Sequence, residues 1–363
     1  MNNLEYSAPK GFKKIISEIV ADRLPCCALI ILLSLYLIIL FADFIAPYSA
    51  NYSDKTLSYQ PPSKIFIIDE NNHLSFPYTY NYKRSFDSET MQMHYNLDKS
   101  QKYYIRLFSK GESYKILGLV SLNRHLFGVE NGGNLFILGT DINGRDTFSR
   151  LLFGGRISLT IGFLALFIAF PIGMLYGGVS GYFGGAIDAL MMRIAEAIMS
   201  IPSFYLLIIM ASVLPAGMTS IQRFLLITVI LALIGWAGIA RVIRGMVMSI
   251  KTNDYVTAAK AIGVSKRGII LKYILPQTLS FVIIAISMNV PSYILSESGL
   301  SFLGLGIQQP DASWGNMLKD SQEYVNILTR PWLLAPGFLI FVSVLSFNII
   351  GDKIRDILDP KSS

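Results

Sequence analysis

The sequence ISLTIGFLALFIAFPIGMLYGGV, residues 157–179, contains no charged side chain. A helix needs about 20 apolar residues to cross the hydrocarbon core of a bilayer, where it must satisfy its own backbone hydrogen bonds. Five other runs have a similar character. The six predicted spans are residues 26–46, 157–179, about 189–214, 224–248, 273–295 and 332–350. The predicted fold class is therefore an all-α polytopic membrane protein with about six transmembrane helices.

The composition agrees with a membrane protein and offers no sign of catalysis. Of the 363 residues, 52% are apolar and 15% charged, with a mean hydropathy of +0.48; a soluble domain is about 25% charged. Two cysteines cannot form a disulfide framework or a four-ligand zinc site. The sequence contains no P-loop, no H-E-x-x-H and no G-x-S-x-G. We therefore predict a chain that is not an enzyme and has no cofactor or metal.

Lysine and arginine residues indicate the orientation. They gather in the N-terminal residues 1–25, in the loop 249–272 and in the C-terminal residues 353–363. Because short loops rich in these residues stay in the cytoplasm, both termini are predicted to be cytoplasmic. Topology then explains the net charge of +7 without a nucleic acid partner. The alternative for the first transmembrane segment, residues 26–47, is a cleaved signal peptide, but its apolar stretch is too long for one.

A long insert, residues 48–139, separates the first two spans and is rich in Tyr, Asn, Ser and Lys. Strand-like runs occur at residues 64–68, 103–108 and 114–120, and the last two read as a hairpin around the loop 109–113. The insert is therefore predicted to be a small, partly β extracytoplasmic domain. The chain's histidines, which lack metal-ligand spacing, all fall in it and are expected at its surface: His73, His94 and His125.

Three ionisable residues within or beside predicted spans are candidates for a function. Arg193 and Glu196 lie three residues apart, so they could simply pair on one helical face. Glu297 follows the fifth span among serines and a glycine. It could face a polar pathway or reach interfacial water, and we retain it as a possible pathway-lining residue.

The most informative loop reads DYVTAAKAIGVS, residues 254–265, and continues to YILP, residues 273–276. It predicts a short helix with small residues on one side and Asp254 near its positive end. Gly263 is a natural stop for that helix, and a second short helix runs on toward Pro276. Such a small-faced unit suits packing into a groove on another protein. The alternative is an ordinary amphipathic surface loop.

Three motifs together carry a resemblance to a known family. Ala258 and Ala259, then Gly263 and then Leu275-Pro276, match the loop signature of bacterial ABC-importer permeases, with Thr257 where the family usually has Glu. The stretch LGTDINGRD at 138–146, with SR and GRIS following, is similar to the entry into the second span in the peptide and nickel branch. SESGLSFLGLG at 296–306, followed by SWG at 313–315, is similar to that branch as well. Within the branch the chain is most similar to C-type oligopeptide permeases.

The resemblance implies a function for the region 140–352, the permease core with five transmembrane helices. It would form half of a translocation pathway for oligopeptides in the bacterial inner membrane. Residues 257–265 would be the coupling helix that sits in a groove of an ATPase, and a bulky charged residue at Ala259 would uncouple transport. The implied partners are a second homologous permease subunit, two ATPase subunits, an extracytoplasmic solute-binding protein, the peptide and the lipid bilayer. The implied ATPase-coupling residues are Asp254, Thr257, Ala258, Ala259, Gly263, Leu275 and Pro276.

Other functions remain open from the sequence. The same machinery could import dipeptides, nickel or a peptide-like antibiotic, because the branch shares these motifs. An ion-driven secondary transporter would predict internal repeats with broken helices in matching positions, and none is evident. A membrane-anchored sensor would leave the five later spans and the loop at 254–265 without a role.

Overall fold

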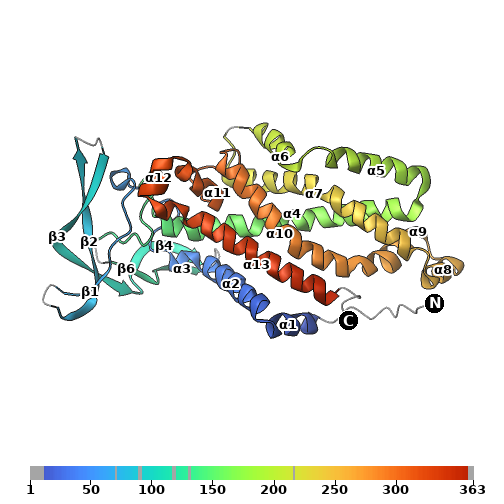
Figure 1. Cartoon of the computed structure of the whole chain (residues 1–363), viewed down its shortest axis with the longest axis horizontal. Helices are drawn as coiled ribbons and strands as arrows, with labels where there is room; N and C mark the ends of the chain where they lie inside the picture. The colour runs from blue at the N-terminus through green and yellow to red at the C-terminus, as the bar shows by residue number, and fades with distance from the viewer. Residues whose placement is uncertain are drawn as a thin grey trace. The chain divides into compact units, whose positions relative to one another are not determined.

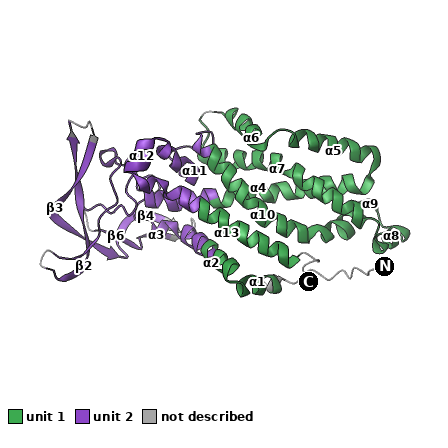
Figure 2. Ribbon diagram, in the orientation of Figure 1, with its two compact units in different colours: residues 1–32, 159–300, 341–363 green, residues 33–158, 301–340 purple. Residues whose placement is uncertain are grey.

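The computed structural model describes residues 12–69, 72–88, 92–116, 120–129, 132–215 and 217–358. The chain divides into two compact units (Figure 2). Unit 1 comprises residues 1–32, 159–300 and 341–363, and unit 2 comprises residues 33–158 and 301–340. Unit 1 consists mainly of long helices, and unit 2 holds the β-strands together with short helices (Figure 1).

The described residues contain five helical segments that are long and apolar enough to cross a membrane. Together with the β insert they confirm the predicted fold class. A sixth span would combine α5 (Gly185–Met199) and α6 (Ser203–Ser212), which are bent by 78°. Pro202 explains this break, because it disfavours helical backbone at Ile201 and lacks an N–H. The five segments are α2 (Arg23–Leu40), α4 (Thr147–Phe183), α7 (Ser220–Ile250), Lys266–Phe302, which includes α10 (Leu279–Phe302), and Pro331–Leu358, which includes α13 (Ala335–Leu358).

Glycines bring α4 and α7 into close contact in unit 1. Gly173, Gly177 and Gly181 are four residues apart, so they lie on one face of α4. A Cβ atom on Gly177 would lie 2.3 Å from the carbonyl oxygen of Ala240, and one on Gly181 would lie 2.7 Å from that of Arg244. Small residues at this spacing let two helical backbones approach each other in a membrane. The α4–α7 contact therefore depends on having glycine, which lacks a side chain, at these positions.

A partly buried ion pair joins α5 to α7. The guanidinium group of Arg244 donates to both carboxylate oxygens of Asp188 at 2.5 Å, and the Ser180 hydroxyl adds a third hydrogen bond. A charge in this environment is costly unless it is paired in this way.

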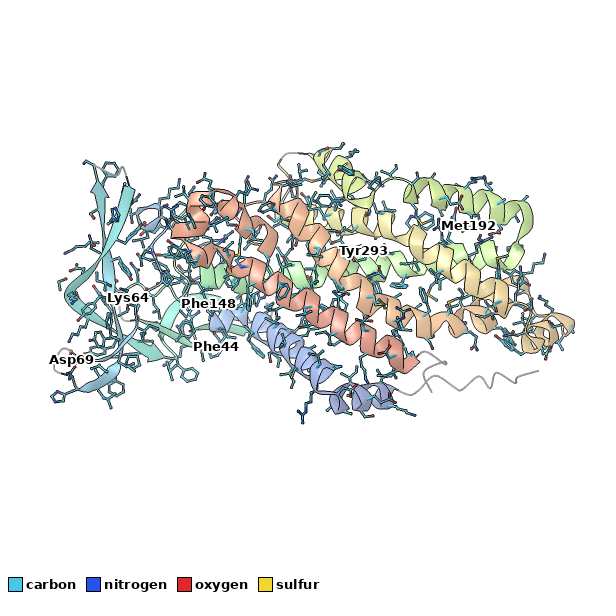
Figure 3. The ribbon with its side chains drawn as sticks, in the orientation of Figure 1. Phe44, Lys64, Asp69, Phe148, Met192 and Tyr293 are labelled. Atoms are coloured by element: carbon cyan, nitrogen blue, oxygen red, sulfur yellow. The ribbon has the colours of Figure 1, made fainter. Side chains whose placement is uncertain are left out.

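Tyr293 of α10, seen in Figure 3, packs on α7, since a Cβ on Gly235 would meet its hydroxyl at 1.9 Å. The predicted local pair of Arg193 with Glu196 is present at 3.6 Å.

Unit 2 contains one four-stranded antiparallel sheet in the order β1-β2-β3-β6 and a separate hairpin of β4 and β5. The predicted hairpin of 103–108 with 114–120 is wrong. Tyr103 and Tyr104 pair with Thr79 and Tyr78, and Tyr114 pairs with Leu122. The chain turns between β3 and β4 at Phe108 and Ser109, and the rest of the predicted loop 109–113 belongs to β4. Alternation of side chains does not by itself identify which strand is the partner. The strands are β1 (Phe66–Ile68), β2 (Leu74–Asp87), β3 (Gln92–Leu107), β4 (Lys110–Ile116), β5 (Val120–Arg124) and β6 (Phe127–Val129).

His125 also departs from its predicted place at the surface. Its side chain is buried, with Nδ1 2.5 Å from the Ala46 carbonyl oxygen and Nε2 3.1 Å from that of Glu112. The ring thus ties the end of α3 (Ala42–Ile45) to the β4–β5 hairpin. His73 and His94 are exposed as predicted.

Two of the sequence motifs meet in unit 2. The backbone N–H of Trp314 donates to the Ser158 hydroxyl at 3.1 Å, and its indole N–H donates to the Leu151 carbonyl at 2.9 Å. Arg150 donates to the Pro310 carbonyl at 2.9 Å. Trp314 is fully buried, so these bonds satisfy its polar groups away from water. They hold the start of α4 to the segment containing α11 (Trp314–Met317), η4 (Leu318–Gln322), α12 (Tyr324–Thr329) and η5 (Pro331–Leu334).

Two aspartates shape the turn before α4. Asp141 accepts bonds from the backbone N–H groups of Asn143 and Arg145 and pairs with the Arg145 side chain at 2.7 Å. Asp146 caps α4 by accepting from the Ser149 N–H at 2.8 Å, and the Ser149 hydroxyl adds a bond of 2.5 Å. Burial raises the pKa of Asp146 from 3.8 to about 7. This carboxyl therefore takes up a proton close to neutral pH.

The α4–α7 contact predicts opposite effects for two glycine substitutions. Gly177→Ala places a methyl group against the Ala240 carbonyl, which should lower the free energy of unfolding by about 1–3 kcal/mol. Gly238→Ala, on α7 with open space around it, should be neutral or stabilising by up to about 1 kcal/mol. Thermal or denaturant unfolding of the full chain in detergent would measure both. Equal effects of the two substitutions would contradict the role given to Gly177.

Asp146 predicts a pH dependence of stability. In the unfolded chain an aspartate loses its proton near pH 3.9, whereas folded Asp146 keeps it to about pH 7. The folded state binds more protons between these values, so stability should fall as pH rises from about 4 to 7. Asp146→Asn keeps a good helix cap and should flatten that part of the profile. The measurement is thermal unfolding at pH 5 and pH 8, and an unchanged slope in Asp146→Asn would refute the assignment.

Candidate functional site

The loop that follows α7 forms a short helix, α8 (Asp254–Ala261), as the sequence predicts. Asn253 has extended backbone and starts the helix, and Asp254 lies in its first turn, where a negative charge favours the helix dipole. Lys260 lies in the last turn, which also suits the dipole. A helix of this length is too short to be stable alone, so its contacts within unit 1 must hold it.

Gly263 ends α8 in the predicted way. Its φ of +82° lies in the left-handed region that favours glycine. The N–H of Gly263 donates to the Lys260 carbonyl and that of Val264 to the Ala259 carbonyl, both at 3.1 Å. These two bonds form a Schellman motif. The helix end is therefore fixed in shape, and the chain turns sharply at Gly263.

The two alanines of the motif lie on opposite sides of α8. Ala259 is 3% exposed and packs inward together with Val256, whereas Ala258 is exposed. Ala259 thus faces unit 1 and not the surface, so a larger residue there would disturb packing within unit 1. The sequence could not settle this, since both positions carry the same small side chain. The role of Ala259 in ATPase coupling stays a prediction. The exposed residues between positions 254 and 262 form the outward face: Asp254, Tyr255, Thr257, Ala258, Lys260, Ala261 and Ile262.

Lysine side chains hold this region to the end of α4. Lys251 donates to the carbonyl oxygens of Gly181 and Tyr182 at 2.8 and 3.4 Å. Such bonds satisfy carbonyls that a helix end leaves free. Lys260 lies over the Tyr182 ring at 5.6 Å, and Lys266 lies over the Phe183 ring at the same distance. In the sequence these lysines indicate only the orientation of the loop. Their spacing along the chain does not predict the contacts that they make.

The chain returns from the loop through irregular helical turns. Ser265 caps α9 (Lys266–Gly268) by accepting from the Gly268 N–H at 3.2 Å. The π-helical turn η2 (Ile269–Ile274) and the 3-10 turn η3 (Leu275–Thr278) then lead into α10. Leu275 is buried, while Pro276 is exposed and cannot donate a backbone hydrogen bond. The Leu-Pro pair thus anchors the turn on one side and interrupts regular helix on the other.

Glu297 lies apart from this loop, near the far end of α10. Its side chain has no exposed surface, and the Ser298 hydroxyl lies 3.5 Å from its Oε2. The site is therefore the outward face of α8 with its supports. Among the described residues, no group of three His, Cys, Asp or Glu side chains is placed to hold a metal ion. A small, stiff, exposed helix of this kind can bind another protein and transmit force.

Comparison with known proteins agrees with this geometry. A family model described as "Binding-protein-dependent transport system inner membrane component" matches residues 169–363, which include α8. A second, described as "N-terminal TM domain of oligopeptide transport permease C", matches residues 16–62. All six strands of the insert lie between these two ranges.

Curated relatives are similar at 43–44% identity. The oligopeptide transport system permease protein OppC of Haemophilus influenzae is 44% identical over 61% of this chain and 70% of its own length. The dipeptide transport system permease protein DppC of Bacillus subtilis is 44% identical over 61% and 68%. OppC of Escherichia coli K12 is 43% identical over 61% and 72%.

These matches confirm the resemblance drawn from the three motifs. ABC permeases of this kind do not hydrolyse ATP themselves, so the chain is a non-catalytic subunit. The chain belongs to the family of inner membrane components of binding-protein-dependent transport systems, as a permease subunit of an ATP-binding-cassette importer.

Proposed function

We propose that this permease subunit imports oligopeptides and that the outward face of α8 docks on an ATPase subunit. Relatives at 43–44% identity are named for oligopeptide or dipeptide transport, which favours a peptide over nickel. The match of residues 16–62 to the N-terminal domain of oligopeptide transport permease C supports oligopeptides among the peptides. The observation that carries the docking proposal is the exposed face of a helix whose other side is buried and whose end is fixed by a Schellman motif.

The orientation and the partners belong to the same proposal. The loop 249–272 and both termini would lie in the cytoplasm, where the ATPase subunits are. A second, homologous permease would supply the other half of the pathway, two ATPase subunits would dock beneath the pair, and a binding protein would deliver peptide from outside. Positive loops at residues 1–25 and 249–272 support this orientation.

The mechanism follows from how α8 is held. Closure of the ATPases would push on the exposed face of the helix, while Val256 and Ala259 keep its inner face packed. Lys251 would pass the displacement to the end of α4 through the carbonyls of Gly181 and Tyr182. Since packed helices respond by shifting as rigid bodies, the movement would reach the membrane-spanning part of unit 1.

Glu297 keeps a place in this proposal as a pathway-lining residue. Because its side chain is buried here, it would line the pathway only when α10 shifts away from its neighbours. Pro291 lies six residues earlier in α10 and removes one backbone hydrogen bond, so the helix is weakest there. Glu297 would then become accessible in the open state alone.

The docking proposal predicts a difference between neighbouring alanines. Ala258→Glu adds a large charged side chain to the exposed face, so peptide uptake should fall at least about tenfold, which corresponds to roughly 1.4 kcal/mol or more at the interface. Thermal stability of the isolated chain and its amount in the membrane should stay unchanged. Radiolabelled peptide uptake and co-purification with the ATPases would measure the effect.

Ala259→Leu is the matched control. It enlarges the buried side of α8, so it should lower thermal stability by about 1–3 kcal/mol. Full uptake and full ATPase association in Ala258→Glu would refute the docking face. A loss of stability in Ala258→Glu as large as that in Ala259→Leu would show that the effect arises from misfolding.

The substrate is tested in proteoliposomes that hold the complete importer with its binding protein. A tetrapeptide should stimulate ATP hydrolysis and accumulate inside, whereas nickel ions should do neither. A dipeptide serves as the nearest competitor. Accumulation of nickel, or transport that persists without ATP, would overturn the proposed function.

A further inference from the structure

One corner of unit 2 exposes large apolar side chains beside the end of the first membrane-spanning helix. The corner is the turn from β3 to β4, where Leu107 is 72% and Phe108 55% exposed. The Phe108 ring lies 6.1 Å from the ring of Phe44 in α3, which Figure 3 labels. The backbone repeats this connection, because the Leu126 N–H donates to the Phe44 carbonyl at 2.7 Å and the Phe108 N–H donates to the Leu126 carbonyl at 2.9 Å.

Phe108 also has an unusual backbone conformation. Its φ of +55° lies in the left-handed region, which glycine and asparagine enter much more easily than a bulky aromatic residue. A turn at this place would form more easily with glycine or asparagine. A strained position that keeps an exposed aromatic side chain points to a contact outside the fold.

The surroundings of the corner favour a lipid surface as that contact. The end of α2 and the residue after it expose large apolar side chains, as lipid-facing segments do. These side chains are Leu37, Leu40 and Phe41. Exposed basic residues flank the apolar pair: Arg106 precedes it, and Lys110 pairs across the β4–β5 hairpin with Arg124. Apolar side chains bordered by lysine and arginine are typical of segments that rest in the headgroup region of anionic bilayers.

We propose that Leu107 and Phe108 insert into the bilayer interface beside the end of the first span, with Arg106, Lys110 and Arg124 facing anionic headgroups. The corner then anchors the β insert to the membrane at a second point. This fixes the insert at a defined height beside the span, which α3 alone, a helix of four residues, would not do. Which leaflet of the bilayer the corner enters depends on the proposed orientation of the chain. The contact between the corner and lipid does not depend on that orientation.

The opposite end of the same sheet supplies a matched control. Phe86 is 52% exposed and pairs with Met93 near the start of β3, whereas Phe108 follows its end. Met93 and Leu107 are fourteen positions apart along β3, a length of about 45 Å. Phe86 and Phe108 are thus alike in side chain and exposure but lie far apart along the ribbon.

The test attaches a nitroxide to single cysteines in the full chain, co-expressed with its partner subunits and placed in vesicles of phosphatidylethanolamine and phosphatidylglycerol. Cys26→Ser and Cys27→Ser remove the natural thiols. Phe108→Cys should show a collision rate with oxygen, relative to a water-soluble nickel chelate, several-fold higher than Phe86→Cys. Leu107→Cys repeats the measurement without altering the left-handed residue, in case Phe108→Cys fails to fold.

Two outcomes would overturn the proposal. Equal accessibility to the nickel chelate at residues 107, 108 and 86 would place the corner in water. Protection of residues 107 and 108 from both oxygen and the chelate would mean that a protein partner covers them. Because no transport is measured, either result would leave the ATPase-docking proposal for α8 unaffected.

Discussion

The close approach of α4 and α7 is the contact on which the helical packing of unit 1 depends. In lipid, apolar side chains gain nothing by meeting each other, so helices associate through tight packing and hydrogen bonds. Gly173, Gly177 and Gly181 leave room for α7 to approach α4. The carbonyl oxygen of Gly181, the last of these glycines, accepts a hydrogen bond from Lys251. The packing that joins the two helices therefore also fixes the base on which α8 rests.

This arrangement explains why a weak helix can serve as a firm element. Eight residues cannot hold a helix in water, yet α8 has its inner face buried, its end set by Gly263 and its lysines fixed on Tyr182 and on backbone carbonyls. Of these supports, Lys260 is exposed, whereas Val256 and Ala259 of the inner face are buried. Under the proposed function, a partner that bound the outward face would not first have to order the helix, which would lower the entropy lost on binding.

Much of this architecture could be predicted from single residues and runs. Five of the six apolar runs, the stop at Gly263 and the pairing of Arg193 with Glu196 follow from local rules, and the structure agrees with them. Partners in a sheet do not follow from such rules: β3 joins β2 and β6, not the strand that follows it. The inward side of Ala259 and the 78° bend at Pro202 likewise depend on what lies opposite, which a periodic pattern does not contain.

The motifs at 138–158 and 310–315 illustrate a further limit and its physical origin. Their polar residues look like candidates for chemistry, but in unit 2 most of them bind one another: Asp141 binds Arg145, one oxygen of Asp146 caps α4, and Ser158 accepts from Trp314. The polar groups that identify the family in this unit thus build a turn that holds the start of α4.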